Sequence, residues 1–142
     1  MRRIITIYYA LHGVNKMLVE FRVKNFRSLR DEQVLSLVAS KDKTLQDTHT
    51  QATGISAAPI LLRSAVVYGA NASGKSNLIK ALQYMRGVVT ESATAIQPGQ
   101  TFAVQPFRLD TDSASQPSEF EVTFLLDGVR YQYRFAMTAQ RI

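Results

Sequence analysis

The chain has 142 residues, of which 46% are hydrophobic, and it carries a formal net charge of +6 at pH 7 without any cysteine. This length suits one globular domain or part of a larger one, and the lack of cysteine argues against a disulfide-stapled secreted protein. No apolar run approaches the ~20 residues that a transmembrane helix requires, and no small-residue cleavage site follows the opening apolar segment. We therefore expect a cytoplasmic protein with no membrane partner.

Basic residues are concentrated near the N-terminus. The first thirty residues hold seven basic side chains and one acidic one, whereas the rest of the chain is balanced. A basic segment of this kind favours phosphate-rich partners such as ATP or DNA, unless its charges form only the solvated face of a strand. Residues 1–16, "MRRIITIYYALHGVNK", precede a better-patterned segment that begins at Met17. We interpret residues 1–16 as an N-terminal extension, with a targeting signal as the alternative.

Two strands are predicted next. Residues 18–26 alternate apolar and charged side chains, which is typical of a half-buried strand, and residues 33–39, "QVLSLVA", show a similar pattern. The polar stretch between them predicts an antiparallel pair joined by a turn. Residues 40–58 are polar and show no periodicity, so we expect a long connector.

The centre of the sequence, "VVYGANASGKSNLIKAL", carries the most informative motif. Gly69 and Gly74 stand five positions apart and are followed at once by Lys75 and Ser76, which fits the pattern G-x-x-x-x-G-K-[ST] of a phosphate-binding loop. An apolar run before the loop indicates a buried parallel strand, and apolar residues at helical spacing after it indicate a helix over roughly 74–89. An ordinary strand-to-helix turn is the alternative.

The chemistry of phosphate binding explains these residue types. Gly69 and Gly74 allow backbone angles closed to other residues and let phosphate oxygens approach the main chain. Backbone N–H groups and the positive end of the helix dipole then form an anion site. Lys75 is expected to reach the β- and γ-phosphates of ATP, and the Ser76 hydroxyl is expected to ligate Mg²⁺.

The last part of the chain predicts a β-hairpin over residues 119–137, "EFEVTFLLDGVRYQYRFAM". With Asp127 and Gly128 as the two loop residues, the apolar side chains of both arms face one another on one side, while charged residues oppose on the other. The expected cross-strand pairs are Leu126–Val129, Phe124–Tyr131, Val122–Tyr133, Phe120–Phe135 and Glu121–Arg134. The alternative is a strand whose final Asp127 is the Mg²⁺-positioning Walker B carboxylate. Upstream, we expect a short strand at residues 106–109 and a surface turn at residues 110–118.

"VEFRVKNFRSL" at residues 19–29, followed by "YGANASGKSNLIKAL" at residues 68–82, resembles the head of SMC/RecF-type ABC-class ATPases. It is most similar to prokaryotic "AAA family ATPase" proteins, and the likeness runs from Met17 to the end of the chain. The resemblance implies an α/β fold: the N-terminal portion of a P-loop NTPase head, in which the P-loop strand and helix join an antiparallel β-lobe made of an N-terminal and a C-terminal hairpin. It also implies a head-to-head homodimer that sandwiches two ATP molecules.

The same resemblance assigns Asn71 and Ser73 to the phosphate and metal site, and it places Arg27 near the nucleotide phosphates, with an exposed strand-end arginine as the alternative. Ala72 stands where many relatives have glycine. The predicted nucleotide-binding residues are thus Gly69, Ala70, Asn71, Ala72, Ser73, Gly74, Lys75, Ser76 and Asn77, together with Arg27.

Several motifs of the complete family head have no counterpart in the sequence, namely a Ser-Gly-Gly signature, a Walker B carboxylate and a switch histidine. No catalytic residue is therefore identified. We expect ATP binding by the front part of a head that would act as a hydrolase when complete, in DNA maintenance or antiphage defence. The alternatives are a non-catalytic nucleotide-binding remnant and a small P-loop kinase.

Overall fold

The computed structural model describes residues 3–8, 16–91 and 103–139. Two compact units can be distinguished in it. Unit 1 comprises residues 1–21, 35–71 and 122–133, and unit 2 comprises residues 22–34, 72–121 and 134–142. None of the helices described is long and apolar enough to cross a membrane.

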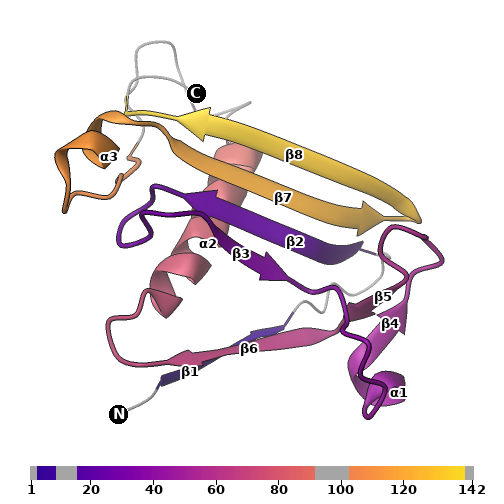
Figure 1. Cartoon of the computed structure of the whole chain (residues 1–142). Helices are drawn as coiled ribbons and strands as arrows, with labels where there is room; N and C mark the ends of the chain where they lie inside the picture. Colours follow the sequence, from indigo (N-terminus) through magenta and orange to yellow (C-terminus); the bar gives the residue numbers. More distant parts are fainter. Residues whose placement is uncertain (1–2, 9–15, 92–102, 140–142) are drawn as a thin grey trace. The chain divides into compact units, whose positions relative to one another are not determined.

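The largest sheet has four strands in the order β3-β2-β7-β8 (Figure 1). Its first two strands, β2 (Lys16–Lys24) and β3 (Gln33–Ser36), are neighbours, as the alternating pattern predicted. The other two, β7 (Ser118–Leu126) and β8 (Val129–Met137), form the C-terminal hairpin. The mixed α/β architecture with an antiparallel sheet is thus present.

The turn of this hairpin falls where the sequence places it. Asp127 and Gly128 both have positive φ, 49° and 78°, which is the conformation of a two-residue type I′ turn. The predicted pairing of Phe124 with Tyr131 is confirmed, because their ring centroids lie 5.4 Å apart in a stacked arrangement. A hairpin turn therefore explains Asp127 better than a Walker B strand does.

Unit 1 contains structure that the sequence did not predict. The expected connector at residues 40–58 is wrong in part, because it includes helix α1 (Gln46–His49) and strand β4 (Thr50–Ala52), which pairs antiparallel with β5 (Ile60–Leu62). Long-range burial stabilises this hairpin despite its polar composition. One buried hydrophobic cluster of the unit consists of Val19, Ala58, Leu61 and Leu125.

The strand that leads into the glycine loop, β6 (Ser64–Gly69), also belongs to unit 1. It pairs antiparallel with β1 (Arg3–Tyr8), in a register that runs from Arg3 opposite Gly69 to Tyr8 opposite Ser64. The prediction of a buried parallel strand is wrong here, since Val66 and Tyr68 are 53% and 74% exposed.

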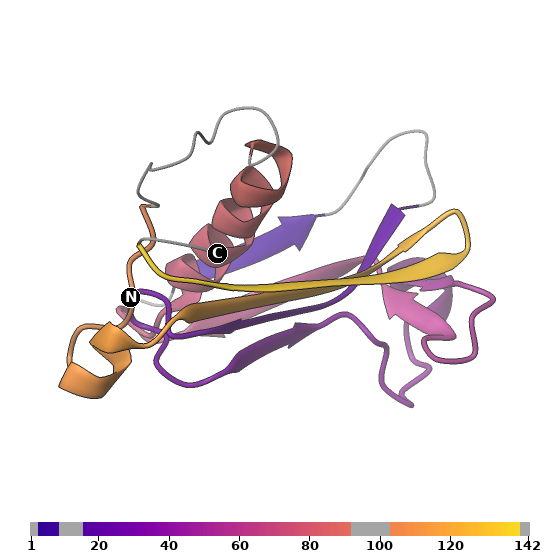
Figure 2. The same ribbon diagram turned by 90° about the horizontal axis from the view of Figure 1, so that it is seen from above.

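Unit 2 is built around an aromatic cluster between the sheet and helix α2 (Lys75–Glu91). The ring of Tyr84 on α2 lies 5.6 Å from both Phe26 and Phe120, and Phe120 stacks on Phe135 at 5.2 Å. Helix α2 therefore lies against the Phe120 end of β7 (Figures 1 and 2). Burial in this cluster raises the pKa of Tyr84.

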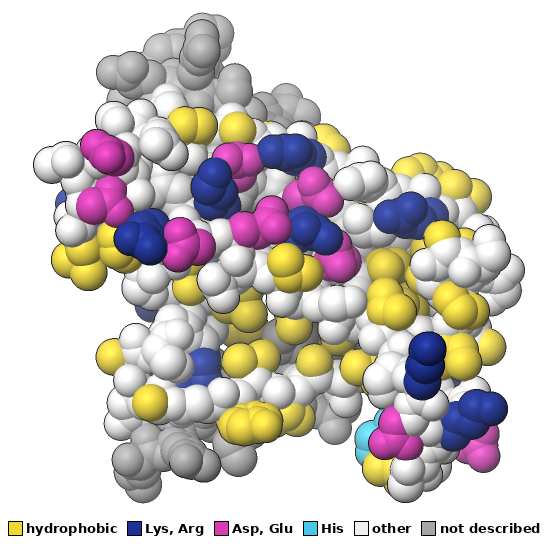
Figure 3. Space-filling model, in the orientation of Figure 1, with side chains coloured by type: hydrophobic (Ala, Val, Ile, Leu, Met, Phe, Trp, Pro, Cys, Tyr) yellow, Lys and Arg dark blue, Asp and Glu magenta, His cyan; other side chains and the backbone are white. Residues whose placement is uncertain are grey.

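The opposite face of the sheet in unit 2 carries charged side chains, which alternate in sign in Figure 3. Lys24 and Arg134 both contact Glu119, at N···O distances of 3.5 and 2.6 Å, and Arg22 lies 3.1 Å from Glu32. The hydrogen bond from Arg134 holds the pKa of Glu119 below its usual range, against a smaller opposing effect of burial. For Arg22 and Lys24, the structure shows the solvated, ion-paired face of a strand.

Strand β8 is an edge strand of the four-stranded sheet and exposes an apolar stripe. Val129, Tyr131 and Tyr133 are 51%, 45% and 47% exposed, whereas Phe135 on the same strand is buried. The predicted apolar side of the hairpin is therefore covered at the Phe135 end and accessible near the turn.

Candidate functional site

A strand precedes the glycine loop in the sequence, and a helix follows it. Strand β6 ends at Gly69 and α2 begins at Lys75, so five residues connect them. In the first helical turn, the backbone N–H groups of Asn77 and Leu78 both donate to the carbonyl of Gly74, at 2.8 and 3.0 Å. The Lys75 ammonium donates to the Ser73 hydroxyl at 3.2 Å, which keeps it over the loop.

Gly74 occupies a position that strongly favours glycine. Its φ is +89°, in the left-handed region, and a Cβ there would lie 3.0 Å from Cδ2 of Leu29 and 3.3 Å from the Ser28 hydroxyl. Both conformation and packing therefore favour glycine at the second glycine position of the motif. It allows the loop to lie directly against the turn that follows β2.

Ala72 also has a positive φ, 63°, a conformation that glycine adopts more readily than alanine. An L-residue in this conformation costs roughly 1–2 kcal/mol. The strain lies between Asn71 and Ser73, two exposed polar residues. The loop thus holds an unfavourable backbone conformation at the middle of the predicted phosphate site.

Arg27 lies in the turn after β2 and is half-buried. Its backbone N–H donates to the carbonyl of Gln105 at 2.7 Å, and its guanidinium carbon lies 5.6 Å from the centre of the Phe26 ring. Its Nε is buried, yet no hydrogen-bond acceptor reaches it within the described structure. Such an orphaned donor is uncommon and calls for an acceptor from a ligand or water.

The same turn connects to the first turn of α2, because the amide nitrogen of Asn77 donates to the Ser28 hydroxyl at 2.7 Å. A cavity of about 360 Å³ opens here, entirely within unit 2. Arg27 and Ser28 line one side, Asn77 lies at the helix, and residues 105–109 form the remaining wall.

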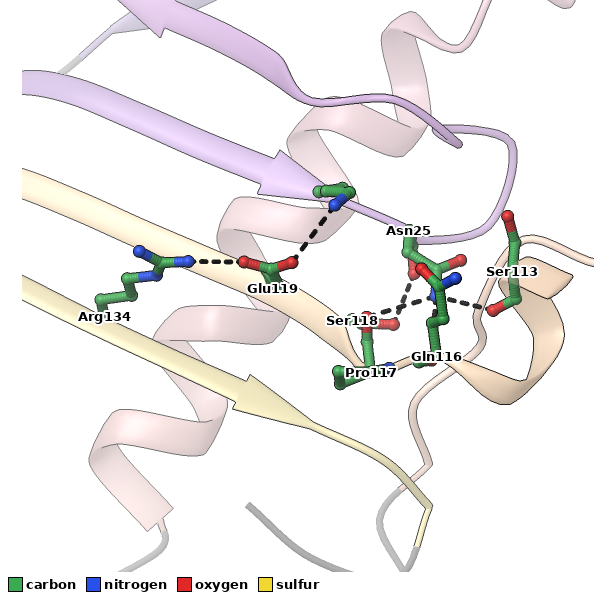
Figure 4. Close-up of polar contacts among 8 residues, drawn as sticks. Asn25, Ser113, Gln116, Pro117, Ser118, Glu119 and Arg134 are labelled. Carbon is green, nitrogen blue, oxygen red and sulfur yellow. Dashed lines mark hydrogen bonds and ion pairs between the residues drawn. The ribbon is translucent and has the colours of Figure 1, made fainter.

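A buried asparagine organises this region, and the sequence did not reveal it (Figure 4). Asn25 is 2% exposed, and its amide nitrogen points at the carbonyls of Ser113, Gln116 and Pro117, at 2.8, 2.9 and 3.2 Å. Its amide oxygen accepts from the backbone N–H of Phe107 at 2.9 Å. One side chain thereby fixes the turn after β2 to two segments more than eighty positions away.

These contacts explain two further differences from the sequence-based expectation. Residues 106–109 do not form a strand, because the Phe107 N–H bonds to a side chain and not to a neighbouring strand. The expected surface turn contains helix α3 (Thr111–Ser115), capped by Asp110, whose carboxylate accepts from the Ser113 N–H at 2.6 Å. That hydrogen bond lowers the pKa of Asp110.

The residues at the loop fit a magnesium-bound triphosphate. Lys75 supplies a positive charge, the exposed Ser76 hydroxyl is an oxygen donor suited to Mg²⁺, and α2 presents its N-terminus. Within residues 3–8, 16–91 and 103–139, no group of three or more His, Cys, Asp or Glu side chains could hold a metal ion. Among the described residues, those of the loop would therefore hold Mg²⁺, and oxygen atoms of the substrate phosphates would be its other ligands.

Strand, left-handed glycine loop and helix define the class of P-loop nucleotide-binding proteins. The family comparison agrees: residues 64–142, more than half of the chain, match the family described as "AAA domain, putative AbiEii toxin, Type IV TA system". The chain belongs to this family, a P-loop ATPase family whose members generally bind ATP with Mg²⁺. Searches of curated proteins and of solved structures found no match.

Proposed function

We propose that the chain binds MgATP through residues 69–77 and that it represents the SMC/RecF-like branch of P-loop ATPases. The observation that carries this proposal is the position of Gly74, whose left-handed backbone lies against Ser28 and Leu29 at the start of a seventeen-residue helix. Asn71, Ala72 and Ser73 in the loop are exposed and therefore accessible to a ligand.

Each residue type has a distinct role in this proposal. Backbone N–H groups at the start of α2 bind phosphate oxygens, helped by the helix dipole. Lys75 neutralises charge on the β- and γ-phosphates, and Ser76 ligates the Mg²⁺ that bridges them. Mg²⁺ supplies charge neutralisation when bound, and the remaining contacts orient the triphosphate.

Hydrolysis, a head-to-head homodimer and binding to DNA belong to the SMC/RecF-like part of the proposal. Asp127 is not assigned to the metal, because it is the first residue of a hairpin turn with φ 49°. Arg22 and Lys24 are not assigned to DNA, because carboxylates already neutralise them. We therefore restrict the proposed function of this chain to nucleotide binding.

The test is titration of the full chain with MgATP, comparing Lys75→Ala with Lys80→Ala. Both changes remove one lysine charge from α2, but Lys80 is an exposed residue outside the motif. Charge-assisted hydrogen bonds to phosphate contribute about 1.5–3 kcal/mol each, so Lys75→Ala should weaken binding by roughly tenfold or more. Equal affinity of the two variants for MgATP would refute the phosphate-loop assignment.

A further inference from the structure

We infer that Ser28 is a positioning residue for the phosphate site, and that it holds the first turn of α2 in the orientation in which the loop receives phosphate. The inference rests on the proposed function, because it takes the position of the phosphates from it. Ser28 is assigned no contact with the ligand. It acts through Asn77 and Gly74 on the main chain that binds the phosphates.

Ser28 meets the start of α2 through two separate contacts. Its hydroxyl accepts a hydrogen bond from the amide nitrogen of Asn77 at 2.7 Å. The same oxygen lies 3.3 Å from the place that a Cβ on Gly74 would occupy, so the main chain at Gly74 passes close to it. One serine thereby contacts both the residue before α2 and the third residue of the helix.

The orientation of this helical turn decides where the phosphate-binding groups point. The N–H groups of Asn77 and Leu78 bond to the carbonyl of Gly74, at 2.8 and 3.0 Å, so the helix starts directly after the glycine. In the proposed function, phosphate is bound by the main chain of the loop and by the N-terminal end of α2. Because the backbone runs without interruption from Gly74 into the helix, a shift of the first turn would redirect these donors.

The turn that carries Ser28 is held in one conformation. The main-chain groups of Phe26 and Leu29 bond to each other in both directions, with N···O distances of 2.9 Å. Asn25 and Arg27 both have φ of 54°, which is unfavourable for residues other than glycine. Such a conformation persists only where the surrounding contacts determine it, and it is frequent at ligand-binding sites. The turn therefore presents the Ser28 hydroxyl as a fixed acceptor.

Contacts outside the turn fix its position as well. The buried side chain of Asn25 bonds to the main chain of two other segments, and the Arg27 N–H donates to the Gln105 carbonyl at 2.7 Å. Leu29 is buried, and its Cδ2 lies 3.0 Å from the Cβ position of Gly74. A site whose main chain is fixed before binding loses less conformational entropy when the ligand arrives. Removing the Ser28 hydroxyl should therefore weaken phosphate binding.

The experiment measures the affinity of the full chain for MgATP and for magnesium tripolyphosphate, which has phosphates but no nucleoside. Ser28→Ala should weaken the binding of both ligands by the same factor, roughly threefold to tenfold, as expected for the loss of one hydrogen bond. Ser36→Ala removes a hydroxyl from an exposed position on β3, outside the turn and the loop, and should change neither affinity.

A matched pair of variants separates the hydroxyl from the shape of the side chain. Ser28→Thr keeps the hydroxyl, and Ser28→Val replaces it with a methyl group in a side chain of the same shape. Any crowding against Gly74 is therefore common to both. Ser28→Thr should bind both ligands more tightly than Ser28→Val, again by roughly threefold to tenfold.

Asn77→Ala removes the donor of the same hydrogen bond. If Ser28 acts through Asn77, the double variant of Ser28→Ala and Asn77→Ala should lose less binding free energy than the sum of the two single losses. Additive losses would show that the two residues act independently, and they would overturn the inference.

The other outcomes separate the inference from the proposed function. If Ser28→Ala leaves both affinities unchanged, or if Ser28→Thr and Ser28→Val bind equally, the positioning role is refuted while phosphate binding stands. A loss of affinity for MgATP alone would mean that Ser28 does not act on the phosphate site, and the inference would again be wrong. Lys75→Ala should weaken both ligands whatever the role of Ser28, and failure to do so refutes the proposed function.

Discussion

Replacing Asn25 should be among the most destabilising single changes in unit 2. The two hydrogens of its amide nitrogen are shared among three carbonyls, and its amide oxygen accepts one N–H, in a site that is 2% exposed. Each buried polar group left without a partner costs about 1–3 kcal/mol. The carbonyl of Pro117, at 3.2 Å, is the weakest contact, so we expect Asn25→Gly to lower the free energy of unfolding by about 3–5 kcal/mol.

The backbone contributes separately. Asn25 has φ 54°, which glycine adopts freely and alanine does not, so Asn25→Ala should lose roughly 1 kcal/mol more than Asn25→Gly. Because a domain is stable by only about 5–15 kcal/mol, both variants should show a clear shift in the midpoint of urea unfolding, followed by circular dichroism. Asn71→Gly makes the same change at an exposed position and is the control. A loss below about 1 kcal/mol in Asn25→Gly would show that the buried amide is not what holds these segments together.

Two further changes test the loop and the charged face. Ala72→Gly should raise the free energy of unfolding by about 0.5 kcal/mol, because it relieves the strain at φ 63°. The control Ala70→Gly should lower the free energy of unfolding. Equal effects of the two changes in urea unfolding would contradict this reasoning. The pKa of Glu119 is lowered by Arg134, so its contribution to stability is complete above the ordinary glutamate pKa and is lost as pH falls through the lower folded-state pKa. The stability difference between the chain and Glu119→Gln should therefore shrink from about pH 6 to about pH 3, and a constant difference would disprove the effect.

Features set by neighbouring residues were predictable from the sequence. The loop between Gly69 and Lys75 and the turn at Asp127 and Gly128 follow from short motifs. The structure has a strand before the loop and a helix after it, and it confirms the position of the turn. In both places glycine removes a steric restriction, and the flanking periodicity identifies the adjoining elements.

Features set by distant contacts were not predictable. Asn25 belongs to the polar stretch "NFRSLRDE", which has the composition of a simple exposed turn, but its hydrogen bonds reach residues 82 to 92 positions away. Similarly, β4 and β5 pair across a segment of polar residues because Leu61 is fully buried in unit 1. The sequence around a residue carries no information on partners that are distant in the chain. A buried polar side chain therefore looks the same in the sequence as an exposed one. The cavity wall at residues 105–109 depends on the same contacts and was missed for the same reason.

The stripe on β8 has a consequence for how the chain behaves in solution. A strand at the end of a sheet that exposes Val129, Tyr131 and Tyr133 is a template for pairing with another strand, and hence a route to aggregation. Arg130 lies beside Tyr131 and places a positive charge on a strand that would otherwise pair with its own copies, whereas the charge of Arg134 is paired with Glu119. Charges in such positions repel one another and oppose pairing between copies of the strand. Salt weakens this repulsion, because the Debye length falls to about 3 Å at 1 M. High salt should therefore promote association of the chain through β8, and low salt should keep its copies apart.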